Sequence, residues 1–268
     1  MPAQVRRLAP DVYHSPNYIL PVALGCPSVV TVHDLELFDR SLHRVRSHLY
    51  LSALTTRAVR QASAVICVSE ATREALIDRF PDTARKARVV TEGVAERFRP
   101  APAAEVAAFR RHHGLHRAFV LFVGTVEPRK NLDRLVRAFS TAMRRTELPH
   151  DLVIVGQDGW RNDAVWRAIE ESPVRDRIRV LGYLDDAWLP AAYSAADALA
   201  YPSLTEGFGL PPGEAMACGT ATLTSHAGAL PETVGDAAHL VDPLDTEDMA
   251  SGPVTLLCDA RRRERLLT

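Results

Sequence analysis

The chain has 268 residues, of which 47% are hydrophobic and 24% charged, and its formal net charge is −1 at pH 7. Such a composition fits an ordinary globular protein with a large core, and a charge near zero argues against a general nucleic-acid binder. The four cysteines are too far apart in sequence for a zinc site or a small disulfide scaffold, so we expect buried free thiols. We find no signal peptide or membrane-spanning run, which favours a cytoplasmic protein.

The first hundred residues predict strands that alternate with helices. Strands are expected at residues 11–15, 28–33, 64–68 and 88–91. An amphipathic helix is expected over residues 42–61, and Ser69 is expected to cap a second helix. This alternation is typical of an α/β fold with a parallel sheet.

An Ala-, Arg- and Pro-rich segment follows over residues 95–117, and we place a domain boundary within it, near residue 100. After a helix over residues 103–113, strands are expected at 118–124, 151–155, 178–182, 198–201, 221–224 and 237–240. Six strands make a complete doubly wound sheet, whereas four do not. We therefore predict an incomplete domain over residues 1–100 and a second Rossmann-like domain over residues 101–268.

The most informative stretch is residues 203–219, a glycine-containing loop that leads from a buried strand into a helix. Gly207 and Gly209 permit a close approach of ligand to backbone. Pro211 suits the first turn of a helix, and Gly219 suits its end. A helix N-terminus presents unpaired N–H groups and a partial positive charge, so this loop favours an anionic ligand.

Two carboxylates, Glu206 and Glu214, flank this loop with seven residues between them. Either glutamate alone would be interpreted as a solvated loop residue or as a partner of the helix dipole. Both together with the glycine loop favour a ligand site. The run resembles the Glu-x7-Glu signature of retaining glycosyltransferases of family 4, whose GT-B fold has two Rossmann-like domains facing a cleft.

A second segment, Glu127-Pro128-Arg129-Lys130-Asn131, lies between the strand that ends at Gly124 and the helix that begins at Leu132. Two cations just before a helix N-terminus oppose the helix dipole, and a bound anion would remove that conflict. An isolated Arg-Lys pair would be interpreted as a solvated turn, but the carboxyl end of a parallel strand is where open α/β sheets bind ligands. The segment resembles the diphosphate-binding segment of the family, which implies that Arg129 and Lys130 hold the diphosphate of a nucleotide sugar.

The chain contains no Asp-x-Asp triplet, the simple arrangement for presenting a metal to a diphosphate. With two cations offered instead, we expect metal-independent stabilisation of the leaving group, with no metal site and no cofactor. The histidines His112, His113 and His116 lack neighbouring carboxylates or cysteines, so a solvated helix end is favoured over a metal site.

Further site residues follow from the family resemblance. A lone histidine such as His33 is more often structural, but Val-His-Asp at 32–34 is similar to a family segment whose histidine faces the donor sugar. The resemblance implies that Glu206 contacts the hydroxyls of the donor sugar and that Glu214 contacts the ribose. The expected catalytic residues are Arg129, Lys130, Glu206 and His33. The expected donor-binding residues are Gly124, Glu127, Tyr183, Leu184, Thr205, Gly207, Phe208, Gly209, Leu210 and Glu214. Gly213 departs from the aliphatic residue usual at its position.

The resemblance implies a hexosyltransferase that moves a hexose from a nucleotide diphosphate sugar to a saccharide or lipid-linked acceptor. Its motifs look most like those of bacterial mannosyltransferases of polysaccharide biosynthesis. The alternative is a non-catalytic nucleotide-sugar binder or an inactive truncated glycosyltransferase, because the family's opening strand–helix units and terminal helix are not recognised here; an epimerase is a further alternative. The basic segment 41–61 is interpreted either as a contact with the inner membrane face or, preferably, as a core-packing helix with a solvated basic side.

Overall fold

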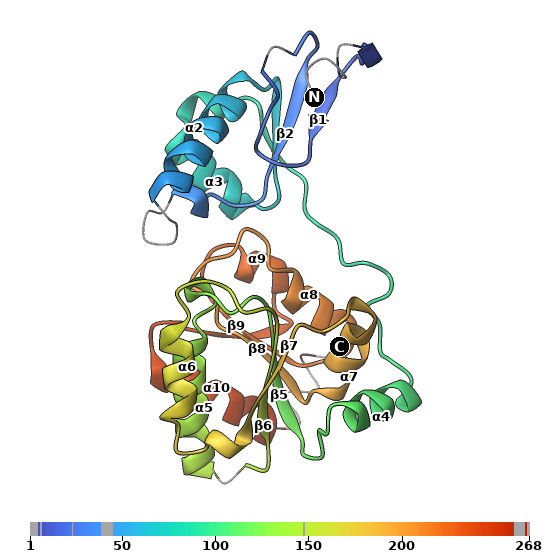
Figure 1. Ribbon diagram of the computed structural model, residues 1–268, viewed down its shortest axis with the longest axis vertical. Coiled ribbons are helices and arrows are strands. Elements are labelled where there is room, and N and C mark those ends of the chain that lie inside the picture. The colour runs from blue at the N-terminus through green and yellow to red at the C-terminus, as the bar shows by residue number, and fades with distance from the viewer. Residues whose placement is uncertain are drawn as a thin grey trace. The chain divides into compact units, whose positions relative to one another are not determined.

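The computed structural model describes residues 5, 7–22, 24–38, 45–146, 148–259 and 266. The chain forms two compact units (Figure 1). The first unit comprises Met1–Glu92 with Glu206–Phe208, and the second comprises Gly93–Thr205 with Gly209–Thr268. Each has its own parallel sheet and its own hydrophobic core, which confirms the predicted α/β class. Within the described ranges, no helix is both long and apolar enough to cross a bilayer.

The sheet of the first unit has four parallel strands in the order β1-β2-β3-β4. These strands are β1 (Tyr13–Ser15), β2 (Ser28–Val32), β3 (Ala64–Cys67) and β4 (Ala87–Val89). The helical segments are η1 (Glu36–Phe38), α2 (Val45–Gln61), α3 (Glu70–Arg79) and η2 (Pro81–Thr83). The side chain of Ser69 accepts a hydrogen bond from the backbone N–H of Thr72, so the predicted cap of α3 is confirmed.

Two expectations for this unit need comment. The strand predicted over residues 88–91 ends at Val89, and the next residue, Val90, is exposed, with its backbone N–H donating to the carbonyl oxygen of Cys67 in β3 at 3.0 Å. The basic segment 41–61 is only partly described, because residues 41–44 and the side chains of residues 45–49 lie outside the described part of the chain. Arg44 and the side chain of Arg46 are therefore outside the described part of the chain. Farther along α2, Ala58 and Val59 are buried in the core.

The sheet of the second unit has six parallel strands in the order β10-β9-β8-β5-β6-β7. The strands are β5 (Phe119–Val123), β6 (Asp151–Val155), β7 (Ile178–Gly182), β8 (Ala198–Tyr201), β9 (Thr222–Ser225) and β10 (Ala238–Val241). Each matches its predicted range to within a residue at either end. The helices are α4 (Ala103–His112), α5 (Leu132–Thr146), α6 (Asp163–Glu170), α7 (Leu189–Ala195), α8 (Leu210–Ala217), α9 (Leu230–Val234) and α10 (Thr246–Cys258), with short 3-10 turns η3 (Pro128–Lys130), η4 (Arg175–Arg177) and η5 (Asp186–Trp188).

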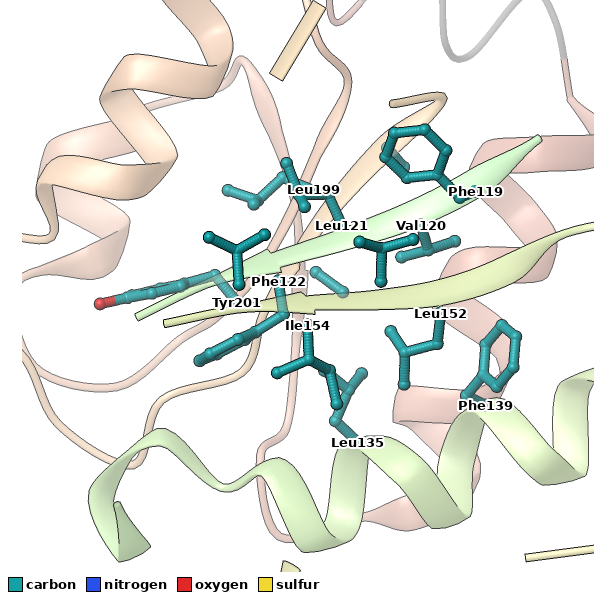
Figure 2. Packing of buried hydrophobic residues seen from close by; sticks show 14 of the residues in the cluster. Phe119, Val120, Leu121, Phe122, Leu135, Phe139, Leu152, Ile154, Leu199 and Tyr201 are labelled. Carbon is teal, nitrogen blue, oxygen red and sulfur yellow. The ribbon is translucent and has the colours of Figure 1, made fainter. Parts of the chain in front are cut away.

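Helices cover both faces of this sheet, with α5, α6 and α10 on one side and α7 and α8 on the other (Figure 1). A strand that is covered on both faces reads as a continuous apolar run, as β5 and β6 do. Figure 2 shows Leu135 and Phe139 of α5 turned toward these two strands. Tyr201 ends β8 with its ring stacked on Phe122, at 5.9 Å between ring centroids, and its hydroxyl oxygen lies at the edge of the cluster (Figure 2).

The order of these six strands reverses between β5 and β8, which are hydrogen-bonded neighbours. From β5 the chain proceeds outward to β6 and β7, and it then returns to the other side of β5 to form β8, β9 and β10. The loops that follow β5 and β8 therefore diverge to opposite faces, and the space between their starting points is where sheets of this type bind ligands. Both of the sequence motifs with ligand-binding chemistry begin at these two strand ends.

The predicted burial of the cysteines was wrong for two of the four. All four cysteines are free, but only Cys67 and Cys218 are buried, while Cys26 is half-buried and Cys258, at the end of α10, is exposed. At and just beyond the end of α4, His112 and His116 are exposed, as predicted, and His113 is half-buried. The ring of His112 stacks on Trp188, and His113 packs against the ring of Phe109, where burial lowers the pKa of His113.

Candidate functional site

The turn after β5 is tied to the neighbouring loops by one buried amide. Asn131 adopts a left-handed backbone conformation with φ 59° between η3 and α5, where an asparagine is tolerated better than most residues. Its side-chain NH2 group donates to the carbonyl oxygens of Pro202, at 3.1 Å, and Pro243, at 2.7 Å. These two prolines follow β8 and β10, so Asn131 fixes the positions of three loops at the carboxyl end of the sheet.

Arg129 connects the β5 turn to the glycine loop. Its backbone oxygen accepts a hydrogen bond from the N–H of Leu204 at 2.8 Å. Its guanidinium donates to the carbonyl oxygen of Thr205 at 3.4 Å and pairs with Oε1 of Glu127 at 2.8 Å. The two predicted segments are therefore in direct contact within the second unit. Glu206 directly follows Thr205 in the chain.

Lys130 is buried rather than solvated, with 7% of its surface exposed. Its ammonium donates to the hydroxyl of Tyr201 at 2.6 Å and lies 4.9 Å from the centroid of the same ring. Taking an ammonium out of water carries a large free-energy cost unless hydrogen bonds compensate, and the tyrosine supplies one of them together with an attractive ring face. The lysine is consequently held at the end of β8, beside the start of the glycine loop.

The glycine loop enters α8 as the sequence predicted. Gly209 precedes the helix with φ 96°, and a Cβ built on it would lie 2.6 Å from Cδ2 of Leu230, so both backbone conformation and space require glycine. Prolines occupy the first turn of α8, where their missing N–H groups cost nothing. Leu210 is the first residue of the helix and is partly exposed. The residues Glu206, Gly207 and Phe208 are grouped with the first unit.

Glu214 lies one turn into α8 and has a specific partner. The hydroxyl of Tyr193, from α7, donates to its Oε2 at 2.7 Å. Burial raises the pKa of the Glu214 carboxyl, and the hydrogen bond from Tyr193 opposes that rise. Burial also raises the pKa of Tyr193 well above its usual value, and the nearby Glu214 carboxylate adds to the effect, so this hydroxyl remains a donor.

The remaining predicted residues do not all gather at the reversal of strand order. Tyr183 and Leu184 follow β7, the edge strand, which is separated from β5 by β6. Tyr183 is exposed, whereas Leu184 is buried in the core of the second unit. His33 follows β2 in the first unit, where its Nδ1 lies 2.8 Å from Oε1 of Glu92 and its Nε2 lies 2.9 Å from the carbonyl oxygen of Pro16.

Three residues of this arrangement were not among the predicted site residues. They are Asn131, which joins the loops, and the tyrosines Tyr193 and Tyr201, which hold the polar atoms of Glu214 and Lys130. Asn131 stood in a quoted motif but had no assigned role. A tyrosine at the end of an apolar strand was the available signal for Tyr201, because a buried hydroxyl needs a hydrogen-bond partner.

Comparison with known proteins places the chain among glycosyltransferases. The model of the family described as glycosyl transferases group 1 matches residues 107–267, and the model described as Glycosyltransferase Family 4 matches residues 1–98. The chain is 33% identical over 257 residues to O-antigen chain mannosyltransferase B of Escherichia coli, covering 94% of this chain and 67% of that protein. It is 29% identical to MMP alpha-(1->4)-mannosyltransferase of Mycolicibacterium hassiacum, covering 91% of this chain and 59% of that protein.

Among solved structures, the chain is similar to Anabaena Alr3699/HepE in complex with UDP and glucose, with a TM-score of 0.82 at 22% identity. That alignment covers 99% of this chain and 74% of the Anabaena chain. The chain thus spans two thirds or less of the curated relatives described above.

Proposed function

Because the chain belongs to the glycosyl transferases group 1 family, we propose that it transfers a hexose from a nucleotide diphosphate sugar to an acceptor. Family membership confirms the resemblance recognised in the sequence, and the similar solved structures confirm the fold class. The mannosyltransferases among its relatives support a hexosyltransferase. Retention of the anomeric configuration, independence of metal, and the kind of acceptor are parts of our proposal.

One observation carries the proposal: the β5 turn and the glycine loop are in contact at the reversal of strand order. Arg129 donates to the carbonyl of Thr205, and Lys130 is held against the last residue of β8. α8 begins five residues beyond Thr205, at Leu210, and its N-terminus adds a partial positive charge. Two cations and a helix N-terminus at one edge of a sheet suit a diphosphate better than a neutral ligand.

In the proposed reaction, the bond between the anomeric carbon and the diphosphate breaks while positive charge at the site stabilises the departing oxygens. Arg129 and Lys130 supply this stabilisation, which is an electrostatic contribution fixed before the reaction begins. An oxygen of the acceptor then forms its bond to the anomeric carbon on the face that the diphosphate leaves. The proton of the acceptor hydroxyl passes to a phosphate oxygen of the leaving group. Because the acceptor bonds to the face that the diphosphate leaves, the anomeric configuration is retained.

The other predicted residues have binding roles in this proposal. Glu206 accepts hydrogen bonds from hydroxyls of the donor sugar, and Glu214 accepts from the ribose. The backbone N–H groups of Phe208, Gly209 and Leu210 contact phosphate or sugar. His33, in the first unit, stays a predicted catalytic residue. The assigned positions near the reversal of strand order, Gly124, Glu127, Thr205 and Gly207, line the donor. Tyr183 and Leu184 have no role in it, because they follow the edge strand β7 and Leu184 is buried in the core.

The identity of the donor is proposed from the relatives. Two of them are named as mannosyltransferases, and one of these is named for an O-antigen chain, which supports a mannose donor and a saccharide or lipid-linked acceptor. The preferred interpretation of residues 41–61 remains a core-packing helix. A cytoplasmic location, at the inner membrane face if the basic side of that helix binds lipid, is part of the proposal.

A panel of nucleotide sugars tests the proposal. GDP-mannose, UDP-glucose and related donors are added to the purified chain, the melting temperature is measured, and release of nucleoside diphosphate is followed with and without saccharide acceptors in EDTA. We expect one donor to raise the melting temperature and to release its diphosphate only when an acceptor is present. If no nucleotide sugar raises the melting temperature, the donor site is assigned wrongly. If a nucleotide sugar binds but no acceptor causes release of its nucleoside diphosphate, the non-catalytic binder is favoured. Conversion of the sugar without an acceptor would favour an epimerase.

A further inference from the structure

The contact between Tyr193 and Glu214 joins two helices at the edge of the site. Tyr193 is fully buried, and its ring meets that of Phe98 edge-on at 6.0 Å between centroids. The hydroxyl of Thr220 donates to the backbone carbonyl of Tyr193 at 2.7 Å, which holds the main chain at the same residue. A tyrosine whose ring is fully buried presents its hydroxyl from one position, so it defines where the carboxylate of Glu214 lies.

The hydrogen bond also distinguishes the two oxygens of the Glu214 carboxylate. Tyr193 occupies Oε2, and among the described residues no hydrogen bond is made to Oε1. A carboxylate has about four acceptor positions, so this one retains capacity for hydroxyl donors at Oε1. Hydrogen bonds to a charged acceptor are shorter and stronger than those between neutral groups.

A half-buried carboxylate is unfavourable for folding unless something offsets its loss of hydration. Burial raises the pKa of Glu214, so a proton competes with any ligand for this group. The hydrogen bond from Tyr193 lowers that pKa and favours the charged form, which is the better acceptor. A tyrosine at this position therefore does two things for a ligand, because it aims one oxygen and keeps the carboxylate ionised.

We propose that Tyr193 is a positioning residue for the nucleoside part of the donor, holding Glu214 by Oε2 so that Oε1 accepts a hydrogen bond from a ribose hydroxyl. The inference rests on the proposed function, since it takes a nucleotide sugar as the ligand. Beyond that function, it assigns Tyr193 to the orientation of the Glu214 carboxylate and Oε1 to the contact with the ligand.

The test compares a nucleoside diphosphate with its 2′,3′-dideoxy form, using GDP and UDP as probes and calorimetry as the measurement. A hydrogen bond to a charged group is worth about 1.5–3 kcal/mol, so the wild type should bind the ribose form roughly 10-fold or more tightly than the dideoxy form. Tyr193→Phe should reduce that ratio by about threefold or more. An unchanged ratio in Tyr193→Phe would overturn the inference.

Thr220→Val is the matched control. It removes the 2.7 Å hydrogen bond to the backbone of Tyr193 but leaves the tyrosine hydroxyl and its contact with Glu214 in place. Both variants should lower the melting temperature, whereas only Tyr193→Phe should change the preference for ribose. If Thr220→Val changes the ratio as much as Tyr193→Phe, the tyrosine acts only through the packing of α7.

The pH dependence of binding gives a second readout. Affinity for the ribose form should fall as pH falls through the pKa of Glu214, because protonation removes the charged acceptor. Tyr193→Phe removes the hydrogen bond that lowers this pKa, so the loss of affinity should begin at a higher pH than in the wild type. The phosphate titration of the probe is the same for both proteins and cancels in the comparison. Superimposable profiles would contradict a role of Tyr193 in keeping the carboxylate ionised.

Glu214→Gln separates failure of this inference from failure of the proposed function. If Glu214→Gln binds both nucleotide forms as the wild type does, Glu214 does not contact the ribose and the proposed donor site is wrong. If Glu214→Gln loses the preference for ribose while Tyr193→Phe retains it, the donor site stands and only the role of Tyr193 is refuted.

Discussion

The two sheets of this protein are built from the same kind of unit but differ in strand order. In the first unit the strands follow one another as β1-β2-β3-β4, whereas in the second the order reverses between β5 and β8. Among the described strands of the first sheet, no such reversal occurs. Its predicted site residue, His33, comes after β2, where no pair of loops diverges from neighbouring strands. In the second sheet, two loops diverge from neighbouring strands, and Arg129, Lys130 and Thr205 meet there. The comparison teaches that strand order, rather than strand content, determines where the binding chemistry collects.

The strongest test of this comparison is to remove one lysine from each unit. Lys130→Met should lower kcat by about 10²–10³, because a charge that stabilises the leaving group is lost. Lys86→Met, in the first unit, removes an ammonium that donates to the carbonyls of Arg60 and Ala62 near the end of α2, and it should cost some stability while leaving kcat within about twofold. Steady-state kinetics with melting temperatures measures both. A Lys130→Met enzyme within about fivefold of the wild type would remove the proposed role of this lysine.

A smaller effect on the kinetics is expected when the guanidinium of Arg129 is replaced by the ammonium of lysine, which keeps the charge but is not planar. Arg129→Lys cannot hold both Glu127 and the carbonyl of Thr205, so the KM for the donor should rise by roughly 10-fold.

Arg177→Lys is a closely matched control at the opposite end of the same sheet. Arg177 pairs with Asp151 at 2.8 Å, with side-chain exposures of 20% and 9%, against 18% and 5% for the pair of Arg129 and Glu127. Its replacement should lower the melting temperature without raising the donor KM. Equal changes of KM in both variants would show that the effect comes from loosening the unit rather than from the site.

The smallest expected effect concerns the first unit. Glu92→Gln removes the charge beside His33 but keeps an oxygen that can accept from its ring, and partly exposed ion pairs contribute about 0–1 kcal/mol. We therefore expect kcat/KM to fall by no more than about fivefold. Asp82→Asn, which alters the exposed pair with Arg60 in the same unit, should leave kcat/KM unchanged. A loss of a hundredfold or more in Glu92→Gln would show that the first unit contributes to the reaction as much as the strand-order reversal does.

The glycine at position 213 is explained by a contact with a distant segment of the chain and not by helix propensity. It stands where the family usually has an aliphatic residue, and a glycine inside a helix weakens it by up to about 1 kcal/mol. A Cβ built on Gly213 would lie 3.0 Å from Cγ2 of Val94, a residue of the segment that opens the second unit. The glycine therefore leaves room for a chain segment that is more than a hundred residues away in sequence.

The sequence alone determined the alternation of strands and helices, the six strand ranges of the second unit, and the loop that leads through Gly209 into α8. These features are local, because burial on both faces, a left-handed glycine and prolines in a first turn each act within a few residues. Only the tertiary structure decided that Tyr193 meets Glu214, that Tyr201 meets Lys130, and that Asn131 reaches Pro243. Such contacts depend on strand order and on how helices pack across the sheet, and hydrophobic periodicity carries no information about which distant side chain will complete a buried hydrogen bond.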